Sequence, residues 1–297
     1  IKYFLGYDSI PYDLSIEDVN QDNYLDLIIV NYGTSNISIL FGSTNKTFLN
    51  QTSYSTNHLS NPISIIVKDI NNDNYFVMII LTEYVSVDGY IIILFGYNNL
   101  TFINKYKYST GDNSFPFTMT LVDFNNDNYF DIAVANTGTN NIVIFFGFGN
   151  GIFTKQTSYS VGNSTMPYYI IAADFNNDNI SDLVVSCLGN DEIVLFLGYK
   201  NGTFQLSKRY STGFGSKPYG LTVADLDNNK QLEVIVSLWG SGDIDILSLY
   251  DAAIFSTEIV YSTDLTLKSS SLSIADFNND NLTDIIVANS ATDDLII

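Results

Sequence analysis

Short apolar runs recur along the whole chain and are separated by turns of Gly, Asn, Asp and Ser. The runs are rich in β-branched and aromatic residues, as in YGLTVA, VIVSL and IDILSL within residues 219–249. They lack the 3.6-residue period of an amphipathic helix, so each run predicts a β-strand. Four successive runs joined by turns predict a four-stranded antiparallel meander.

The same pattern occurs six times in one register. Acidic loops align the copies at spacings of 51, 54, 51, 51 and 51 residues, and a tyrosine stands fifteen residues before the first aspartate of each loop. Repeats of this length with four strands each are typical of propeller blades. We therefore expect an all-β fold, a single β-propeller domain of four-stranded antiparallel blades.

The copies span approximately residues 1–52, 53–106, 107–157, 158–208, 209–259 and 260–297, and the last copy is cut short in its third strand. A ring is usually closed by a blade that takes strands from both ends of the chain. The sequence thus fits either six blades or a fragment of a seven-bladed ring, and we expect it to be part of a larger chain.

Each copy carries an acidic loop between its first and second strands. Oxygen-bearing side chains stand at positions 1, 3, 5 and 9 of the loop, and the backbone carbonyl of position 7 can complete a shell of the kind that Ca²⁺ prefers. The predicted ligands are Asp18, Asn20, Asp22, Tyr24 and Asp26; Asp123, Asn125, Asp127, Tyr129 and Asp131; Asp174, Asn176, Asp178, Ile180 and Asp182; Asp225, Asp227, Asn229, Gln231 and Glu233; and Asp276, Asn278, Asp280, Leu282 and Asp284.

The second loop departs from this pattern. Asp69, Asn71 and Asp73 are followed by Val77 at position 9, so weak or absent binding is expected there and about five ions in the whole chain. EF-hands do not fit, because they need a Glu at position 12 and flanking helices. Metal-free Asx turns are the alternative, although crowded carboxylates without a cation are costly. Position 6 is Asn in five loops and Lys230 in the fifth, which predicts a positive φ.

Composition and charge narrow the class of partner. Hydrophobic residues make up 46% of the chain, whereas 32 acidic residues against 12 basic ones give a net charge of -20. Such a chain has material for a core and repels nucleic acid and anionic lipid. No apolar run is long enough to insert directly into a membrane.

The residues offer little chemistry for catalysis. One His and one Cys lie in different repeats, so they cannot form a nucleophilic pair, and Cys187 is interpreted as a small buried residue. Asp243, Asp245 and Glu192 stand outside the acidic loops and are interpreted as solvated turn residues. We therefore expect no enzymatic activity.

The motifs resemble those of a known family. A Phe-Gly pair followed by a Gly/Asn turn, and the D-x-[DN]-x-D-N-x-x-D loop between two strands, are similar to the FG-GAP/VCBS repeats of integrin α-chain propellers. The resemblance covers essentially the whole chain and implies calcium in the loops already named. It also implies an extracellular or cell-surface protein that binds a protein or a glycan. The broken second loop and the loss of Phe-Gly in the fifth copy (LSLYDA) depart from the family pattern.

A ligand is expected on the turns opposite the acidic loops, where the copies differ most. Candidate contact residues are Trp239, Tyr84, Tyr12, Tyr168 and Tyr219, since exposed aromatic side chains favour protein or glycan contacts. Eight N-x-S/T sequons agree weakly with a secreted glycoprotein. Calcium-dependent adhesion or recognition is the first hypothesis. The alternatives are a non-catalytic targeting propeller attached to a hydrolase or lyase, and a purely structural spacer.

Overall fold

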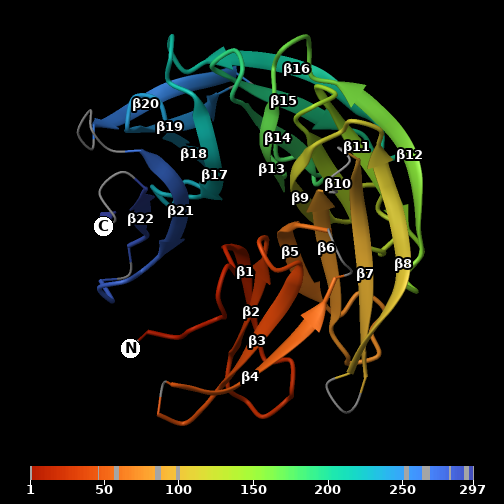
Figure 1. Cartoon of the computed structure of the whole chain (residues 1–297). Helices are drawn as coiled ribbons and strands as arrows, with labels where there is room; N and C mark the ends of the chain where they lie inside the picture. Colours follow the sequence, from red (N-terminus) through yellow and green to blue (C-terminus); the bar gives the residue numbers. More distant parts are fainter. Residues whose placement is uncertain are drawn as a thin grey trace. The chain divides into compact units, whose positions relative to one another are not determined.

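The computed structural model of the chain describes residues 2–45, 47–56, 60–83, 88–97, 101–250, 254–262, 268–280, 282–290 and 294–296. In this part of the chain all regular secondary structure is β-strand (Figure 1). The chain divides into two compact units, one of Ile1–Leu121, Asn128–Thr139 and Val143–Thr157, and one of Val122–Asp127, Asn140–Ile142 and Ser158–Ile297. Each unit is described by itself below.

The first two sheets lie in the first unit, and each runs in chain order, β1-β2-β3-β4 and β5-β6-β7-β8. Their strands are β1 (Pro11–Glu17), β2 (Asp26–Asn31), β3 (Asn36–Gly42), β4 (Phe48–Ser55), β5 (Pro62–Lys68), β6 (Val77–Glu83), β7 (Gly89–Tyr97) and β8 (Thr101–Gly111). A third sheet contains β9 (Pro116–Val122), β10 (Asp131–Asn136), β11 (Asn141–Gly147) and β12 (Phe153–Ser160).

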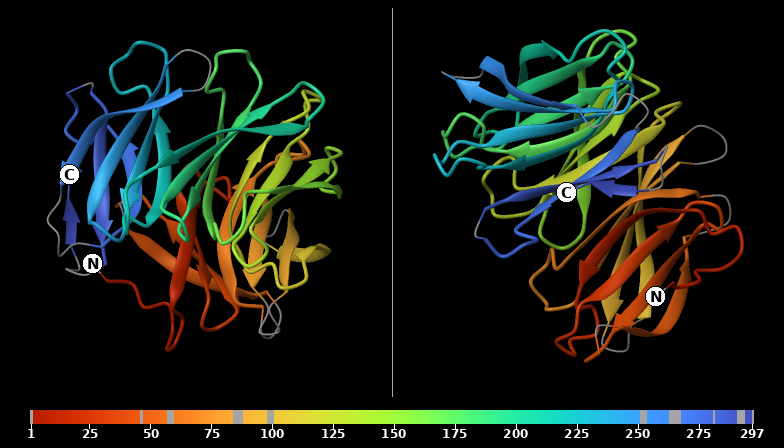
Figure 2. Two further views of the ribbon diagram at one scale, coloured as in Figure 1. Left: turned by 90° about the horizontal axis from the view of Figure 1, so that it is seen from above. Right: turned by 90° about the vertical axis from the view of Figure 1, so that its left-hand side faces the viewer.

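The remaining sheets belong to the second unit and repeat the same meander. Their strands are β13 (Pro167–Ala173), β14 (Asp182–Cys187), β15 (Glu192–Gly198), β16 (Phe204–Ser211), β17 (Pro218–Ala224), β18 (Glu233–Leu238), β19 (Asp243–Tyr250), β20 (Ile254–Ser262), β21 (Ser269–Ala275), β22 (Asp284–Asn289) and β23 (Asp294–Ile296). Figure 2 shows the neighbouring strands of these sheets in two further views. Among the described residues five sheets have four strands and the last has three, as the repeats predict.

Within each unit the core lies between successive sheets. The second strands β10, β14 and β18 are buried at all six positions. In β18, Val234 and Val236 pack with the fourth sheet on one face, and Ile235 packs with the sixth sheet on the other. In the second unit, for example, Leu195 and Val184 of the fourth sheet pack with Val236 and Leu247 of the fifth. Burial on both faces explains why these segments are continuous apolar runs in the sequence instead of alternating ones.

The periodic tyrosines join neighbouring sheets. The hydroxyl of Tyr159 on β12 accepts a hydrogen bond from the backbone N–H of Phe204, 3.1 Å away at the start of β16, and the two ring centroids are 5.8 Å apart. Tyr108 makes the same contacts with Phe153, at 3.0 Å and 6.0 Å. Residues separated by 45 positions thus form a repeated tyrosine–phenylalanine joint.

Tyr159→Phe is expected to lower the free energy of unfolding by about 1 kcal/mol. The ring is retained, but the partly buried N–H of Phe204 loses its acceptor. Tyr199→Phe is the matched control, because the Tyr199 hydroxyl meets Gln205 at an exposed site. Chemical denaturation of the three proteins checks the difference, and equal stability of both variants would argue against the joint.

Candidate functional site

The acidic loops lie where the sequence places them, between the first and second strands of the sheets. The first loop follows β1 and ends at Asp26, the first residue of β2, and the fourth follows β13 and ends at Asp182. Loop positions are counted from the first aspartate. The third loop is divided between the two units, with Asp123, Asn125 and Asp127 in one and Tyr129 and Asp131 in the other.

Backbone N–H groups hold the side chains of each loop in place. In the fourth loop Asp174 at position 1 accepts hydrogen bonds from the N–H groups of Asp178 and Asn179, at 3.1 and 2.8 Å. Asn176 accepts from the N–H of Asp178, and Asp178 accepts from the N–H of Ile180 at position 7. These bonds fix the side chains of positions 1, 3 and 5 against the backbone of a tight turn.

The tight turn depends on left-handed backbone at two positions. Position 6 has a positive φ at Asn23, Asn74, Asn128, Asn179 and Lys230, with values of 69°, 67°, 67°, 63° and 71°, as the sequence predicts. Position 4 is also left-handed, from Gln21 in the first loop to Asn279 in the sixth, and the sequence analysis missed it. Asparagine at position 4 in most of the six loops was the available signal.

Lys230 is the strained member of this series, because lysine tolerates a φ of 71° less well than asparagine does. Lys230→Asn is expected to raise the free energy of unfolding by about 1 kcal/mol, without a new contact. Asn179→Lys in the fourth loop is the reciprocal variant and should lower it by a similar amount. Thermal unfolding in the presence of chelator separates this backbone effect from metal binding, and opposite signs in the two variants are required.

The carboxylate at position 9 connects the loop to the third strand. Asp182 is fully buried and accepts hydrogen bonds from the N–H of Phe175 at 3.1 Å and from that of Gly198 at 2.8 Å. A Cβ at Gly198 would lie 2.2 Å from the carbonyl oxygen of Ser181, so only glycine fits there. Asp26 makes the same pair of bonds. Position 9 therefore has a structural role, whereas the sequence predicted only a metal ligand there.

The second and fifth loops modify this connection. In the second, Val77 cannot accept a hydrogen bond, and the N–H of Gly96 donates instead to the carbonyl of Phe76 at 3.1 Å. In the fifth, the longer Glu233 accepts from the N–H of Leu226 at 2.8 Å. Its other oxygen lies 3.5 Å from the hydroxyl of Ser248. Loss of the Phe-Gly pair thus accompanies the change from Asp to Glu.

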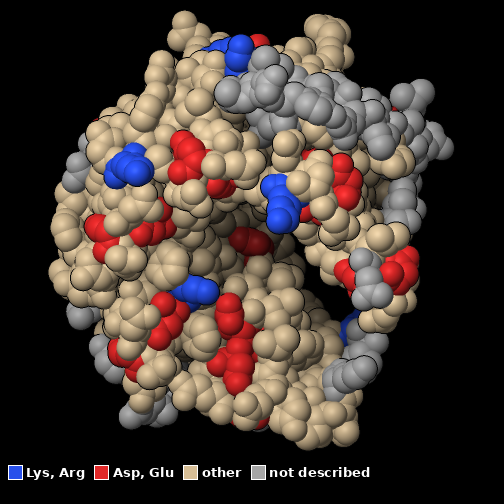
Figure 3. Space-filling view, turned by 180° about the vertical axis from the view of Figure 1, so that it is seen from behind, with Lys and Arg blue, Asp and Glu red and all other residues tan. Residues whose placement is uncertain are grey.

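Among the described residues only the fifth loop brings three carboxylates together. Oxygens of Asp225, Asp227 and Glu233 all lie within 4.8 Å of one another. The other loops carry Asn at position 3, whose amide donates to the position 5 carboxylate, as from Asn20 to Asp22 at 2.9 Å. Figure 3 shows acidic side chains in several separate groups on one face, with sparse lysine and arginine beside them. The fifth loop has the donor set that best fits a hard divalent cation.

Crowded carboxylates and burial change the acidity of these loops. Burial raises the pKa of Asp182 to about 6, against the lowering effect of the bonds from Gly198 and Phe175, and the charges of Asp178 and Asp174 raise it further. The pKa of Asp26 is raised for the same reasons. The loops therefore disfavour accumulated negative charge unless a cation shares the site.

The predicted ligand-contact aromatics lie in separate environments. Trp239 is half-buried, and the ammonium groups of Lys217 and Lys268 lie 5.1 and 4.4 Å from its ring centroid. Tyr168 and Tyr219 are joined by a 2.5 Å bond between their hydroxyls, with ring centroids 4.3 Å apart.

Two further predicted contact residues complete this set. Tyr12 is 45% exposed and packs against Tyr32 and Phe117, with ring centroids 5.5 and 5.8 Å apart. Tyr84 lies outside the described residues.

The interpretation of three acids as solvated turn residues is wrong. Glu192 and Asp243 begin strands β15 and β19, and Glu192 pairs with Arg209 at 2.9 Å. Asp245 lies inside β19 and is only 4% exposed. Cys187 is buried, as predicted, and burial raises the pKa of its thiol to about 12.

Comparison with protein families agrees with the loop geometry. The model of the FG-GAP-like repeat matches residues 18–80, 123–185 and 182–236, together more than half of the chain. No curated protein matches the chain. Within the described residues, no helix is long and apolar enough to cross a bilayer.

Solved structures show the same fold at low sequence identity. A protein of unknown function from Desulfotomaculum acetoxidans is 13% identical, with a TM-score of 0.67 over 99% of this chain and 83% of that one. A putative 6-phosphogluconolactonase from Bacteroides uniformis is 11% identical, with a TM-score of 0.63 over 100% and 85%. The periplasmic gluconolactonase of Pseudomonas aeruginosa is 13% identical, with a TM-score of 0.62 over 86% and 71%. At such identities the likeness extends to the fold alone.

Proposed function

Because the chain belongs to the FG-GAP-like repeat family, we propose that it is a calcium-binding recognition propeller of the cell surface or the extracellular space. Calcium is held by the acidic loops at one end of each sheet. A protein or glycan is bound by the turns at the other end of the strands. The ions stabilise the fold, and the turns supply the specificity.

One observation carries the metal assignment. The carboxylates of Asp225, Asp227 and Glu233 converge within 4.8 Å, where they repel one another unless a cation lies between them. Their donor atoms are all oxygens, the ligand type of calcium and magnesium. Calcium fits better than magnesium, because it accepts irregular shells of six to eight oxygens whereas magnesium needs a near-ideal octahedron. Millimolar extracellular calcium would keep such loops filled, which supports a location outside the cell.

The proposed role is binding without catalysis. Cys187 is buried, and its raised pKa keeps the thiol protonated, so it is unsuited to nucleophilic attack. The buried position 9 carboxylates Asp26 and Asp182 are engaged by backbone N–H groups. These groups serve the architecture of the blades, and the turns remain available for recognition.

Counting calcium on the dialysed protein tests the proposal. Extensive dialysis against metal-free buffer followed by calcium addition and equilibrium dialysis should show saturable binding at several sites. Asp225→Asn combined with Asp227→Asn should remove one ion. Asp69→Asn, in the loop with Val77 at position 9, should remove none. The absence of saturable binding at millimolar calcium would refute the metal assignment.

A further inference from the structure

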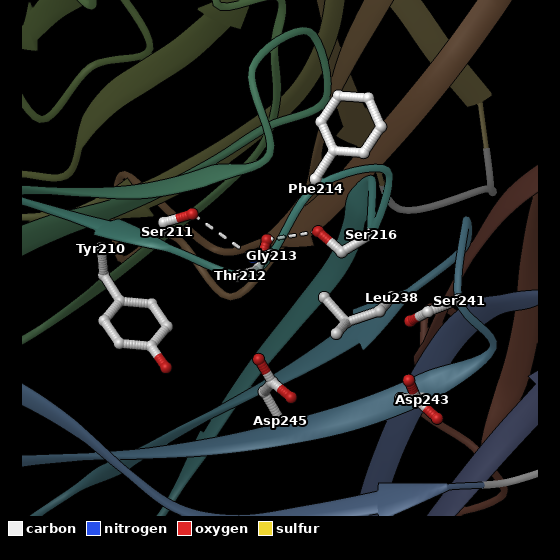
Figure 4. Close-up of a pocket in the computed structure, with 10 residues that line it drawn as sticks. All are labelled: Tyr210, Ser211, Thr212, Gly213, Phe214, Ser216, Leu238, Ser241, Asp243 and Asp245. Carbon is white, nitrogen blue, oxygen red and sulfur yellow. Dashed lines mark hydrogen bonds between the residues drawn. The ribbon is translucent and has the colours of Figure 1, made fainter.

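A pocket lies at the turn end of the fourth and fifth sheets. It has a volume of about 310 Å³, and all its lining residues belong to the second unit. One wall is the end of β16 with the turn that follows it, from Tyr210 to Ser216. The other wall is formed by Leu238 and Ser241 and by the first residues of β19 (Figure 4).

A buried carboxylate points into this pocket. In Figure 4 Asp245 projects from β19 toward the space between Tyr210 and Leu238. Its residue surface is 4% exposed, and it has no hydrogen-bond partner among the described residues. The hydroxyl oxygen of Ser241, on the same lining, is also buried without a partner in this part of the chain. Buried polar groups are normally paired, and an unpaired buried carboxylate is particularly costly.

This aspartate is particular to the fifth blade. Asp245 lies opposite Val236 in the ladder between β18 and β19. In the first four repeats the corresponding third-strand residues are Ser38, Ile92, Val143 and Val194, which are all almost fully buried, and in the sixth it is Ile296. An aliphatic residue therefore fits this position well, and the packing of the blade does not require an acid. A role in binding explains an otherwise unfavourable residue.

The lining chemistry indicates a cationic ligand. Asp243 and Asp245 supply carboxylates, Ser211, Thr212 and Ser216 supply hydroxyl groups, and the described lining contains no lysine, arginine or histidine. A metal ion would leave most of the 310 Å³ unfilled, and Leu238 with the ring of Tyr210 provides apolar surface for a carbon chain. The volume is at the lower end of small-molecule pockets.

We propose that this pocket binds a primary aliphatic ammonium group, which donates a charge-assisted hydrogen bond to the carboxylate of Asp245. Such bonds are about twice as strong as neutral ones and would supply the partner that the aspartate lacks. Burial, followed by the charge of Asp243, raises the pKa of Asp245 to about 6, so the carboxylate is mainly ionised at a pH of about 7.5. The buried hydroxyl of Ser241 supplies a further oxygen on the lining.

The inference rests on the proposed recognition role, because it names the chemical class of ligand that the turns of the fourth and fifth sheets would bind. The pocket lies at the opposite end of the strands from the acidic loops, so amine binding and calcium binding are measured separately. If calcium binds and the amine does not, only the amine site is refuted. If the amine binds and calcium does not, only the metal assignment is refuted.

Isothermal titration calorimetry with n-butylammonium at pH 7.5, in saturating calcium, tests the site. We expect saturable binding that Asp245→Asn weakens at least tenfold. Asp112→Asn is the matched control, because it removes the same charge at an exposed position in the first unit and should leave the affinity unchanged. Nα-acetyl-lysine methylamide, tested in parallel, shows whether the pocket accepts the ammonium group of a lysine residue or only that of a small amine. Binding of either compound supports the proposal.

Several results would overturn it. Saturable binding of n-butylammonium that is equal in the parent and in Asp245→Asn would place the amine elsewhere. No saturable binding of either amine would remove the site. Preferential binding of glucose, or of n-butanol, would show that charge does not determine the ligand. Asp245→Val gives a second variant if Asp245→Asn folds poorly, because valine already occupies this position in two other blades.

Discussion

Removal of calcium is expected to lower the midpoint of thermal unfolding by at least about 15 °C. A ligand present at a hundred times its dissociation constant stabilises the folded state by about 2.7 kcal/mol per site, and one kcal/mol corresponds to about 2–4 °C in a domain of roughly 200 residues. Several filled loops therefore contribute energy comparable to the whole stability of a domain. Differential scanning calorimetry with calcium and with chelator measures the change.

Single loops provide the control for this experiment. Asp225→Asn should reduce the difference between the calcium and chelator midpoints, since the fifth loop has the three converging carboxylates. Asp69→Asn should leave the difference unchanged, because Val77 already deprives the second loop of its last acid. A midpoint that does not respond to chelator would contradict both the metal assignment and the extracellular location inferred from it.

Asp245→Val is expected to raise the free energy of unfolding at pH 7.5 by about 1–3 kcal/mol, without added amine, because the open pocket lets solvent screen part of the charge. Burial raises the pKa of Asp245 in the folded protein to about 6, from an ordinary value of 3.8. Each unit of this difference corresponds to about 1.36 kcal/mol. Valine removes the unpaired charge and matches Val143 and Val194 in the neighbouring blades. Denaturant unfolding at several pH values measures the gain.

The sign of the pH dependence follows from the raised pKa. Well below pH 3.8 Asp245 is protonated in both states, and its charge then has no effect on stability. As the pH rises through 4 to 6, ionisation in the unfolded chain destabilises the native state, and above 6 the full effect is reached. The advantage of Asp245→Val should therefore be small at pH 4 and largest above pH 6.5. A variant less stable than the parent at pH 7.5 would show that the carboxylate has a stabilising partner.

The repeated register made most of the fold predictable from the sequence. The spacing of the acidic loops indicated the number of sheets, and the apolar runs indicated the strands. Asparagine at position 6 predicted a positive φ that the structure confirms at Asn23 and Asn179. These features depend on residues close together in sequence, so a single copy already contains the information.

Contacts between distant residues were harder to predict. The bond between Asp182 and Gly198 joins two parts of one repeat that are 16 residues apart, and the joint of Tyr159 with Phe204 spans 45. Both pairs were visible as periodic residues, but periodicity alone does not identify a partner. The burial of Asp245 had a clearer signal, because the other copies carry aliphatic residues or serine at its aligned position.

The tyrosine–phenylalanine joint also bears on how such a protein can grow. Each sheet contributes a tyrosine to the joint with the next sheet and a phenylalanine to the joint with the previous one, as residues 108, 153, 159 and 204 show. A duplicated gene segment of one repeat length would therefore encode both the tyrosine and the phenylalanine that connect the new sheet to its neighbours. Blade number can change in evolution by whole-repeat duplication or deletion, with no new interface to be invented.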